Sequence, residues 1–248
     1  MYSFALRTCL VCALLAAVFA EIPSYIKICS RTDPNINKCI LNSIEQLRGK
    51  LATGIQELDV PAIEPLELKH IRLLRGPQTA RLDVNLTNLL VSGPSKFEIR
   101  NFKADVSNLV FTYNLHFNQL DFRGKYKIDA SILLLRLIGD GNVTGSFFDY
   151  ESDSYMKANK IVKNNNTYIE FEKMKFRIKI GGAKINLDNL FGGDPILGPA
   201  SNEVLNANSD LFLDEIKPVL EDALSNIFTN VANKITGSFT YDELFPSK

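Results

Sequence analysis

The chain contains 248 residues, and its 28 basic and 28 acidic side chains cancel to a formal net charge of zero at pH 7. A chain without a net field is not drawn toward nucleic acid or anionic lipid, so no nucleic-acid partner is expected. Sixteen Phe and eight Tyr provide much apolar surface, and no Pro-, Ser- or Gly-rich linker or solenoid repeat divides the chain.

The first 20 residues have the pattern of a secretory signal peptide. Arg7 precedes an apolar stretch from Cys9 to Ala20, and small residues near Ala20 provide a cleavage site. Cleavage after Ala20 leaves one domain of residues 21–248, in which no run of about 18 apolar residues could span a bilayer. We therefore expect a secreted, extracellular protein without stable membrane insertion.

Two cysteines, Cys29 and Cys39, remain after the signal peptide is removed. By residue type alone they could form a disulfide, a redox pair or part of a metal site. An exported protein meets an oxidising environment, in which a cysteine pair normally becomes a disulfide. A zinc site needs more ligands, and the chain contains only two histidines, His70 and His116. We predict a structural disulfide and no metal site.

Three sequons of the N-glycosylation pattern begin at Asn85, Asn142 and Asn165. Attached glycans are bulky and belong to protein surfaces. We therefore expect all three sites on surface loops, in agreement with secretion.

The first predicted element is an amphipathic helix. Asp33 followed by Pro34 is typical of a helix N-cap and a first helical proline. Behind them, apolar residues recur at spacings of three and four: Ile36, Ile40, Ile44, Leu47, Leu51 and Ile55. The helix is predicted to end near residue 53, because the prolines in residues 57–65 force extended backbone.

From residue 66 to residue 190 the apolar period changes to two, which predicts strands. In residues 109–118 the apolar face holds Leu109, Phe111, Tyr113, Leu115 and Phe117. Later segments repeat the pattern with Tyr126, Ile128, Ala130 and Ile132, and with Phe176, Ile178 and Ile180. The phase slips between Phe171 and Met174, which predicts a bulge. His116 falls on a polar face and His70 lies among basic residues, so both are expected at the surface.

A long helix is predicted from about Ser209 to Ile235. Its apolar stripe holds Phe212, Leu213, Ile216, Val219, Leu220, Ala223, Leu224, Ile227, Phe228, Val231 and Ile235. About 27 residues make a helix of about 40 Å, whose wide stripe needs a concave sheet to cover it. Pro218 is expected to kink it or to mark a join between two helices. The pattern predicts an α+β fold, in which a strongly curved antiparallel sheet wraps a long C-terminal helix.

Several stretches occur in the order CSRTDPNINKC, GIQELDVPAIEPLEL, GKYKIDASILLLRLIGDG, DNLFGGDPILG and YDELFP. They resemble the insect haemolymph juvenile-hormone-binding and takeout family over nearly the whole mature chain. The resemblance implies a long helix rolled in a curved antiparallel sheet, with an internal apolar tunnel that carries terpenoid hormones or fatty-acid-like lipids. Moth hormone carriers have a second disulfide that this chain lacks, so the takeout branch, associated with feeding, chemosensory tissue or clock-controlled expression, is the better match.

The candidate tunnel residues share an inward position on a predicted strand or on the long helix. They are Phe111, Tyr113, Leu115, Phe117, Tyr126, Ile128, Ile132, Phe176, Ile178, Ile216, Leu220, Leu224 and Phe228. Each could equally be ordinary core, since tunnels and cores use the same residue types. Tyr113 and Tyr126 have hydroxyls that could orient a ligand head group, although a buried Tyr usually bonds to backbone.

No motif points to catalysis. The chain has no Gly-x-Ser-x-Gly elbow, no His-Glu-x-x-His pattern, and no cysteine left as a nucleophile once the disulfide forms. We therefore expect a non-enzymatic protein without a cofactor, a secreted carrier of a hydrophobic small molecule. The alternative is a secreted signalling protein whose surface a receptor reads, with the ligand as regulator.

Overall fold

The computed structural model describes residues 22–75, 82–132 and 135–247, so the predicted signal peptide lies outside the described residues. The helices are α1 (Ile36–Thr53), α2 (Leu197–Ala207), α3 (Ser209–Gly237) and α4 (Tyr241–Leu244), with short 3-10 helices η1 (Gln56–Leu58) and η3 (Pro94–Lys96). The strands are β1 (Leu66–Arg75), β2 (Leu82–Ser92), β3 (Glu98–Asp105), β4 (Val110–Ile132), β5 (Leu135–Lys163), β6 (Asn166–Phe171) and β7 (Lys175–Leu187).

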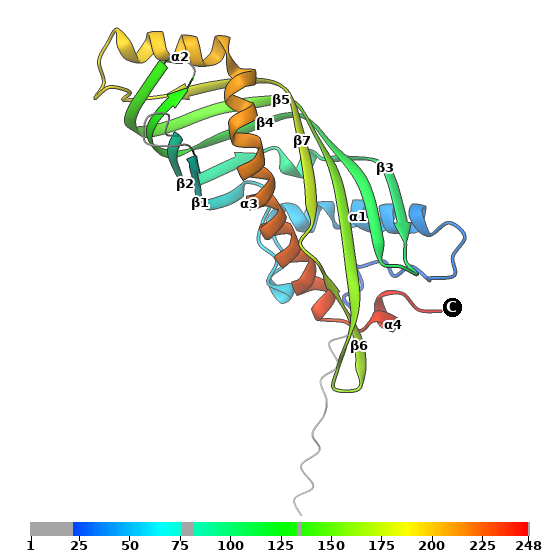
Figure 1. The fold of residues 1–248 in the computed structure, drawn as a ribbon. Coiled ribbons are helices and arrows are strands. Elements are labelled where there is room, and N and C mark those ends of the chain that lie inside the picture. The colour runs from blue at the N-terminus through cyan, green and yellow to red at the C-terminus, as the bar shows by residue number, and fades with distance from the viewer. Residues whose placement is uncertain (1–21, 76–81, 133–134, 248) are drawn as a thin grey trace, which may run out of the picture.

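Two long strands, β4 and β5, form the centre of a seven-stranded antiparallel sheet. Toward one end of this pair the strand order is β1, β2, β4, β5, β7, and toward the other end β3 and β6 flank the same two strands. Figure 1 shows the sheet curling around α3, which runs from α2 at one end to α4 at the other. The predicted α+β fold, a curved antiparallel sheet with a long C-terminal helix, is confirmed.

The inner face of the sheet changes phase at one level across three strands. On β4 both Phe117 and Leu120 are buried, so inward positions switch from odd to even. β5 and β7 switch beside Asp149 and Gly181, while the pairing register is kept on both sides. Asp149 has a positive φ of 47°, and a Cβ atom added at Gly181 would lie 2.8 Å from the Asp149 Cβ. The phase changes lie side by side on β4, β5 and β7, and they bend the three strands together.

A second irregularity lies where β6 meets β7. Residues 172–174 lie opposite only residues 156–157 of β5. This excess of one residue is the bulge predicted from the phase slip, and it restores the alternation of inward side chains. The backbone N–H of Met174, inside the bulge, donates to Thr229 Oγ1 of α3 at 2.9 Å.

The first helix begins two residues later than predicted. Asp33 Oδ1 accepts a hydrogen bond from Asn35 N at 2.7 Å, and Asp33 O accepts one from Ile36 N at 3.1 Å. Residues 33–36 therefore form a turn in front of the helix, and Pro34 is not its first residue. The predicted end near residue 53 is confirmed.

The long C-terminal helix is continuous. α3 passes through Pro218 as one helix, so the expected alternative of a join between two helices is wrong. α2, which precedes it, was not predicted. Within the described ranges, neither α3 nor any other helix is long and apolar enough to cross a membrane.

α2 and α3 cover the open edge formed by β6 and β7. Asn206 of α2 exchanges two hydrogen bonds with the backbone of Ile185, each 2.7 Å long. Asn233 of α3 does the same with the backbone of Phe171, at 2.6 and 3.1 Å. α3 also contacts β1 at the opposite edge of the sheet. The helices thus close the gap between the two edges of the curled sheet and leave less backbone open to strand pairing.

Candidate functional site

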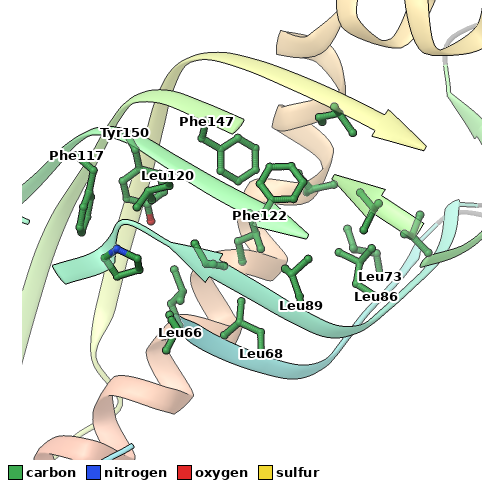
Figure 2. A pocket seen from close by; sticks show the side chains of 18 of the residues that line it. Leu66, Leu68, Leu73, Leu86, Leu89, Phe117, Leu120, Phe122, Phe147 and Tyr150 are labelled. Carbon is green, nitrogen blue, oxygen red and sulfur yellow. The ribbon is translucent and has the colours of Figure 1, made fainter. Parts of the chain in front are cut away.

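Two apolar pockets lie between the sheet and the helices. The inner pocket has a volume of about 150 Å³ and is lined by β1, β2, β4, β5, β7 and α3. Figure 2 shows its walls, with Leu66 and Leu68 facing Phe122 and Phe147 across the space. The N-terminal pocket has a volume of about 450 Å³ and is lined by residues 26–29, α1, β3, β4, α3 and the C-terminal segment. Five residues line both pockets: Leu66, Pro94, Leu115, Phe117 and Phe228.

Most of the predicted tunnel residues border one of these pockets. The inner pocket receives Leu115, Phe117, Tyr126, Ile128, Phe176, Ile216, Leu220, Leu224 and Phe228. The N-terminal pocket receives Phe111, Tyr113, Leu115, Phe117 and Phe228. Ile178 borders neither pocket and packs in the core with Phe117, Leu120 and Tyr150. The side chain of Ile132 falls outside the described residues. Ligand contact by any of these side chains stays a prediction.

Sequence reasoning missed several parts of the lining, among them every residue that β1, β2 and β5 contribute. β1 and β2 supply Leu66, Leu68, Leu73, Val84, Leu86 and Leu89. The alternation of Leu82, Val84 and Leu86 is the signal that could have found the β2 residues. Ile26 and Ile28 line the N-terminal pocket from an irregular segment, which has no period to read, so tertiary contacts alone place them there.

The phenols of the interior are held neutral. The Tyr126 hydroxyl donates to the Asp188 carbonyl, and burial, with the nearby charges of Asp188 and Asp140, raises the Tyr126 pKa to about 12. The Tyr126 hydroxyl is therefore bonded to the backbone and is not left to orient a ligand head group. Burial also raises the pKa of Tyr113 to about 12, although the nearby Ser154 hydroxyl has a smaller effect that lowers this pKa.

The expected surface position of His116 is wrong. His116 is only 8% exposed, because β3 pairs beside it and places Glu98 directly opposite. Its Nδ1 lies 2.9 Å from Arg100 Nη2 and 3.4 Å from Glu98 Oε2. His70 is exposed, as predicted. Among the described residues, no group of three His, Cys, Asp or Glu side chains is arranged to hold a metal ion.

The two cysteines form the predicted disulfide, with their Cα atoms 5.8 Å apart. Cys29 lines the N-terminal pocket, as does Phe245 of the C-terminal segment. The two segments are tied together, because Arg31 Nη1 lies 2.6 Å from Asp242 Oδ1 and Arg31 N donates to Pro246 O at 2.9 Å. The disulfide loop and the chain end therefore close one side of this pocket together.

The three sequons have different surroundings. Asn165 lies in the exposed turn between β5 and β6, with a φ of 61°. Asn142 lies within β5, and its Nδ2 donates to Asp188 Oδ2 at 2.8 Å. Asn85 lies within β2, and its Oδ1 is buried without a hydrogen-bond partner in the described chain. The expectation of surface loops is therefore wrong for Asn85 and Asn142, because the alternating strand pattern continues through both.

An antiparallel sheet curled into a half-barrel and closed by one long helix over an apolar interior is the architecture of a binding protein. The chain belongs to the haemolymph juvenile hormone binding protein (JHBP) family, whose model matches residues 8–246.

Relatives and a solved structure agree with this assignment. The circadian clock-controlled protein daywake of Drosophila melanogaster is 25% identical over 232 residues, which cover 90% of this chain and 88% of daywake. The "Putative beta-carotene-binding protein" of Schistocerca gregaria is 22% identical over 223 residues, 88% and 86% of the two chains. The crystal structure of Takeout 1 from Epiphyas postvittana superimposes with a TM-score of 0.76 at 21% identity and covers 89% of this chain and 100% of its own.

Proposed function

We propose that this protein is a secreted carrier that holds one hydrophobic small molecule in a tunnel formed by the two pockets. The observation that carries this proposal is the set of five residues that lines both pockets. The described lining of the inner pocket includes no charged side chain, and that of the N-terminal pocket includes one, Lys27. A terpenoid or a fatty-acid-like lipid suits such an interior.

Burial of apolar surface supplies enough free energy for this role. A ligand that hides about 400 Å² of apolar surface gains roughly 10 kcal/mol at 25 cal/mol per Å². Association costs of about 4 kcal/mol or more leave up to about 6 kcal/mol, which corresponds to a Kd of tens of micromolar. No catalytic group is needed for this function.

The named relatives support the physiological part of the proposal. Daywake is described as clock-controlled, which favours a link of this chain to circadian, feeding or chemosensory physiology. The locust relative is named for beta-carotene binding, and beta-carotene is an apolar molecule. The description of the locust relative favours carriage of an apolar cargo.

Carriage is favoured over a signalling role in which a receptor reads the outer surface. An apolar surface patch without an internal cavity would favour the signalling role, whereas enclosed apolar space favours carriage. Two apolar pockets are present between the sheet and the helices.

The carrier role is tested on protein secreted from insect cells. Native mass spectrometry is expected to show a population heavier than the polypeptide and its glycans, and organic extraction is expected to release a lipid that mass spectrometry identifies. A protein that carries only its own mass, and that takes up no added apolar probe, would refute the proposal.

A further inference from the structure

The inner pocket contains a buried polar group that the protein leaves unpaired. Ser152 of β5 is 2% exposed and lines the pocket. Its Oγ has no hydrogen-bond partner in the described chain. Native proteins pair nearly all of their buried hydroxyls with protein or water, so an exception inside a cavity needs an explanation. A ligand oxygen in the pocket would supply the missing partner.

The cross-strand neighbours of Ser152 are apolar. In the sheet it lies opposite Leu115 of β4 and Ile178 of β7. Tyr150, two residues earlier on the same face, places a second hydroxyl in the lining, and Figure 2 shows its ring beside Phe117. The remaining polar side chain of the described lining, Tyr126, already donates its hydroxyl to the Asp188 carbonyl.

Ser152 lies near the place where the two pockets meet. Its neighbour Leu115 lines both pockets, and so does Phe117 opposite Tyr150. Apolar space therefore extends in two directions from the Ser152 hydroxyl. A ligand that reaches both pockets would place a middle part of its chain, and not its end, beside this hydroxyl.

The charges around this point disfavour an anion. No Lys, Arg or His appears in the described lining of the inner pocket. Glu221 of α3 approaches the same face, where its Oε1 accepts a hydrogen bond from Ile178 N at 2.7 Å. Burial and this carboxylate both raise the pKa of Tyr150. An ionised carboxylate on the ligand would lose its hydration here and would face a like charge.

We propose that Ser152 is a specificity-determining residue, which donates a hydrogen bond to an uncharged carbonyl oxygen part-way along an otherwise apolar ligand. This inference rests on the proposed carrier function and names the class of its cargo. The preferred ligand is a long-chain ketone or ester, in preference to a plain hydrocarbon or an ionised fatty acid.

The test compares a long symmetrical dialkyl ketone with the linear alkane of the same chain length. Their affinities are measured for the wild-type protein, for Ser152→Ala and for Ser154→Ala by displacement of a fluorescent apolar probe. Ser154 is a matched control, since it lies two residues along the same strand face and is buried, but does not line the inner pocket. The ketone and the alkane differ in their free energy of transfer from water, but this difference is the same for every variant and cancels when their affinity ratios are compared.

We expect Ser152→Ala to lower this ratio by about fivefold, the contribution of one hydrogen bond, and Ser154→Ala to leave it unchanged. The melting temperature of ligand-free Ser152→Ala is expected to equal or exceed that of wild type, because no internal hydrogen bond is lost. An unchanged ratio in Ser152→Ala, or palmitate bound more tightly than the ketone by wild type, overturns the inference and leaves the carrier role standing. Failure of wild type to bind either neutral probe overturns the carrier role itself.

Discussion

Asn206 of α2 and Ile185 of β7 are joined by two hydrogen bonds, in which the side-chain amide acts as a neighbouring strand would. Ile185 N donates to Asn206 Oδ1, and Asn206 Nδ2 donates to Ile185 O, each at 2.7 Å. The pairing fixes α2 against the edge of the sheet. Because Ile185 also lines the inner pocket, this contact holds one wall of the proposed binding site in place.

Replacement of Asn206 by Ala is expected to destabilise the fold. The change leaves the N–H and C=O of Ile185 without partners at a half-buried edge, and each lost pairing costs about 1–3 kcal/mol. Urea unfolding should therefore show a loss of about 2 kcal/mol or more. Asn159→Ala, at an exposed site on β5, is the control and should change stability by about 0.5 kcal/mol or less. If the two variants were equally stable, this would contradict the role of Asn206 in fixing α2 against the edge of the sheet.

The disulfide is expected to stabilise the fold and to slow ligand release. Cys29→Ser opens a short loop, so the free energy of unfolding should fall by about 3 kcal/mol. Because Cys29 lines the N-terminal pocket, stopped-flow measurement of probe release should also show a faster rate. A Cys29→Ser, Cys39→Ser double variant should match the single variant in both measurements. An unchanged release rate with lowered stability would limit the disulfide to a role in folding.

Filling the junction of the pockets is expected to reduce ligand binding. Leu115→Trp adds volume at a side chain that lines both pockets, so a long ligand should bind at least about tenfold more weakly, a loss of about 1.4 kcal/mol. Leu74→Trp, at a position that is 56% exposed, is the matched control and should bind as wild type does. Probe titration with a circular dichroism check of folding measures both variants. Full binding by Leu115→Trp would contradict the proposal that the two pockets form one continuous tunnel.

Stability above pH 10 is expected to depend on Tyr150. Burial, with the Glu221 carboxylate nearby, raises the Tyr150 pKa above its ordinary value, whereas an unfolded tyrosine ionises near pH 10. The folded state thus holds the proton more tightly, so this contribution is complete below about pH 10 and is lost as pH rises further. In Tyr150→Phe, the decline in unfolding free energy between pH 9 and pH 11 should be about 1 kcal/mol smaller than in wild type. If wild type and Tyr150→Phe lost the same unfolding free energy over this pH range, the pKa of Tyr150 would not be raised in the folded state.

Asn165 is expected to be a glycosylated sequon. Its turn between β5 and β6 is exposed, whereas the side-chain oxygen of Asn85 is buried within β2. Intact-mass analysis of the secreted protein should show the loss of one glycan in Asn165→Gln. The same analysis of Asn85→Gln should show no loss. The reverse result would contradict the placement of these two strands and their turn.

The local periodicity of the chain predicted much of the fold. Alternation at Tyr126, Ile128 and Ala130 identified inward side chains of β4, and all three are buried. The helical spacing from Phe212 onward predicted α3. Phe212, Leu213 and Ile216 of the predicted stripe are buried, together with Ser225 and Thr229, which the stripe does not include. The phase slip between Phe171 and Met174 predicted the bulge that the structure contains. These features follow from backbone geometry within a few residues, which is why one sequence is enough to find them.

Other features depend on contacts between distant segments. His116 stands at a polar position of its strand, and its burial is decided by β3, which pairs beside it. Ile178 has the same inward pattern as Phe176, yet only Phe176 reaches a pocket. Alternation reports which face of a strand is apolar, and it carries no information about what lies opposite that face.

The sequence by itself determined the family, the disulfide-bonded pair and the order of strands and long helix. Only the tertiary structure decided where the apolar faces leave space between them, and which polar group inside that space lacks a partner. Ser152 shows the physical reason. The local sequence pattern of β5 sets the face of the strand on which Ser152 lies. The absence of a hydrogen-bond partner for its hydroxyl depends on every segment that packs around it. The proposed ligand specificity therefore arises from packing between segments that are distant in the sequence.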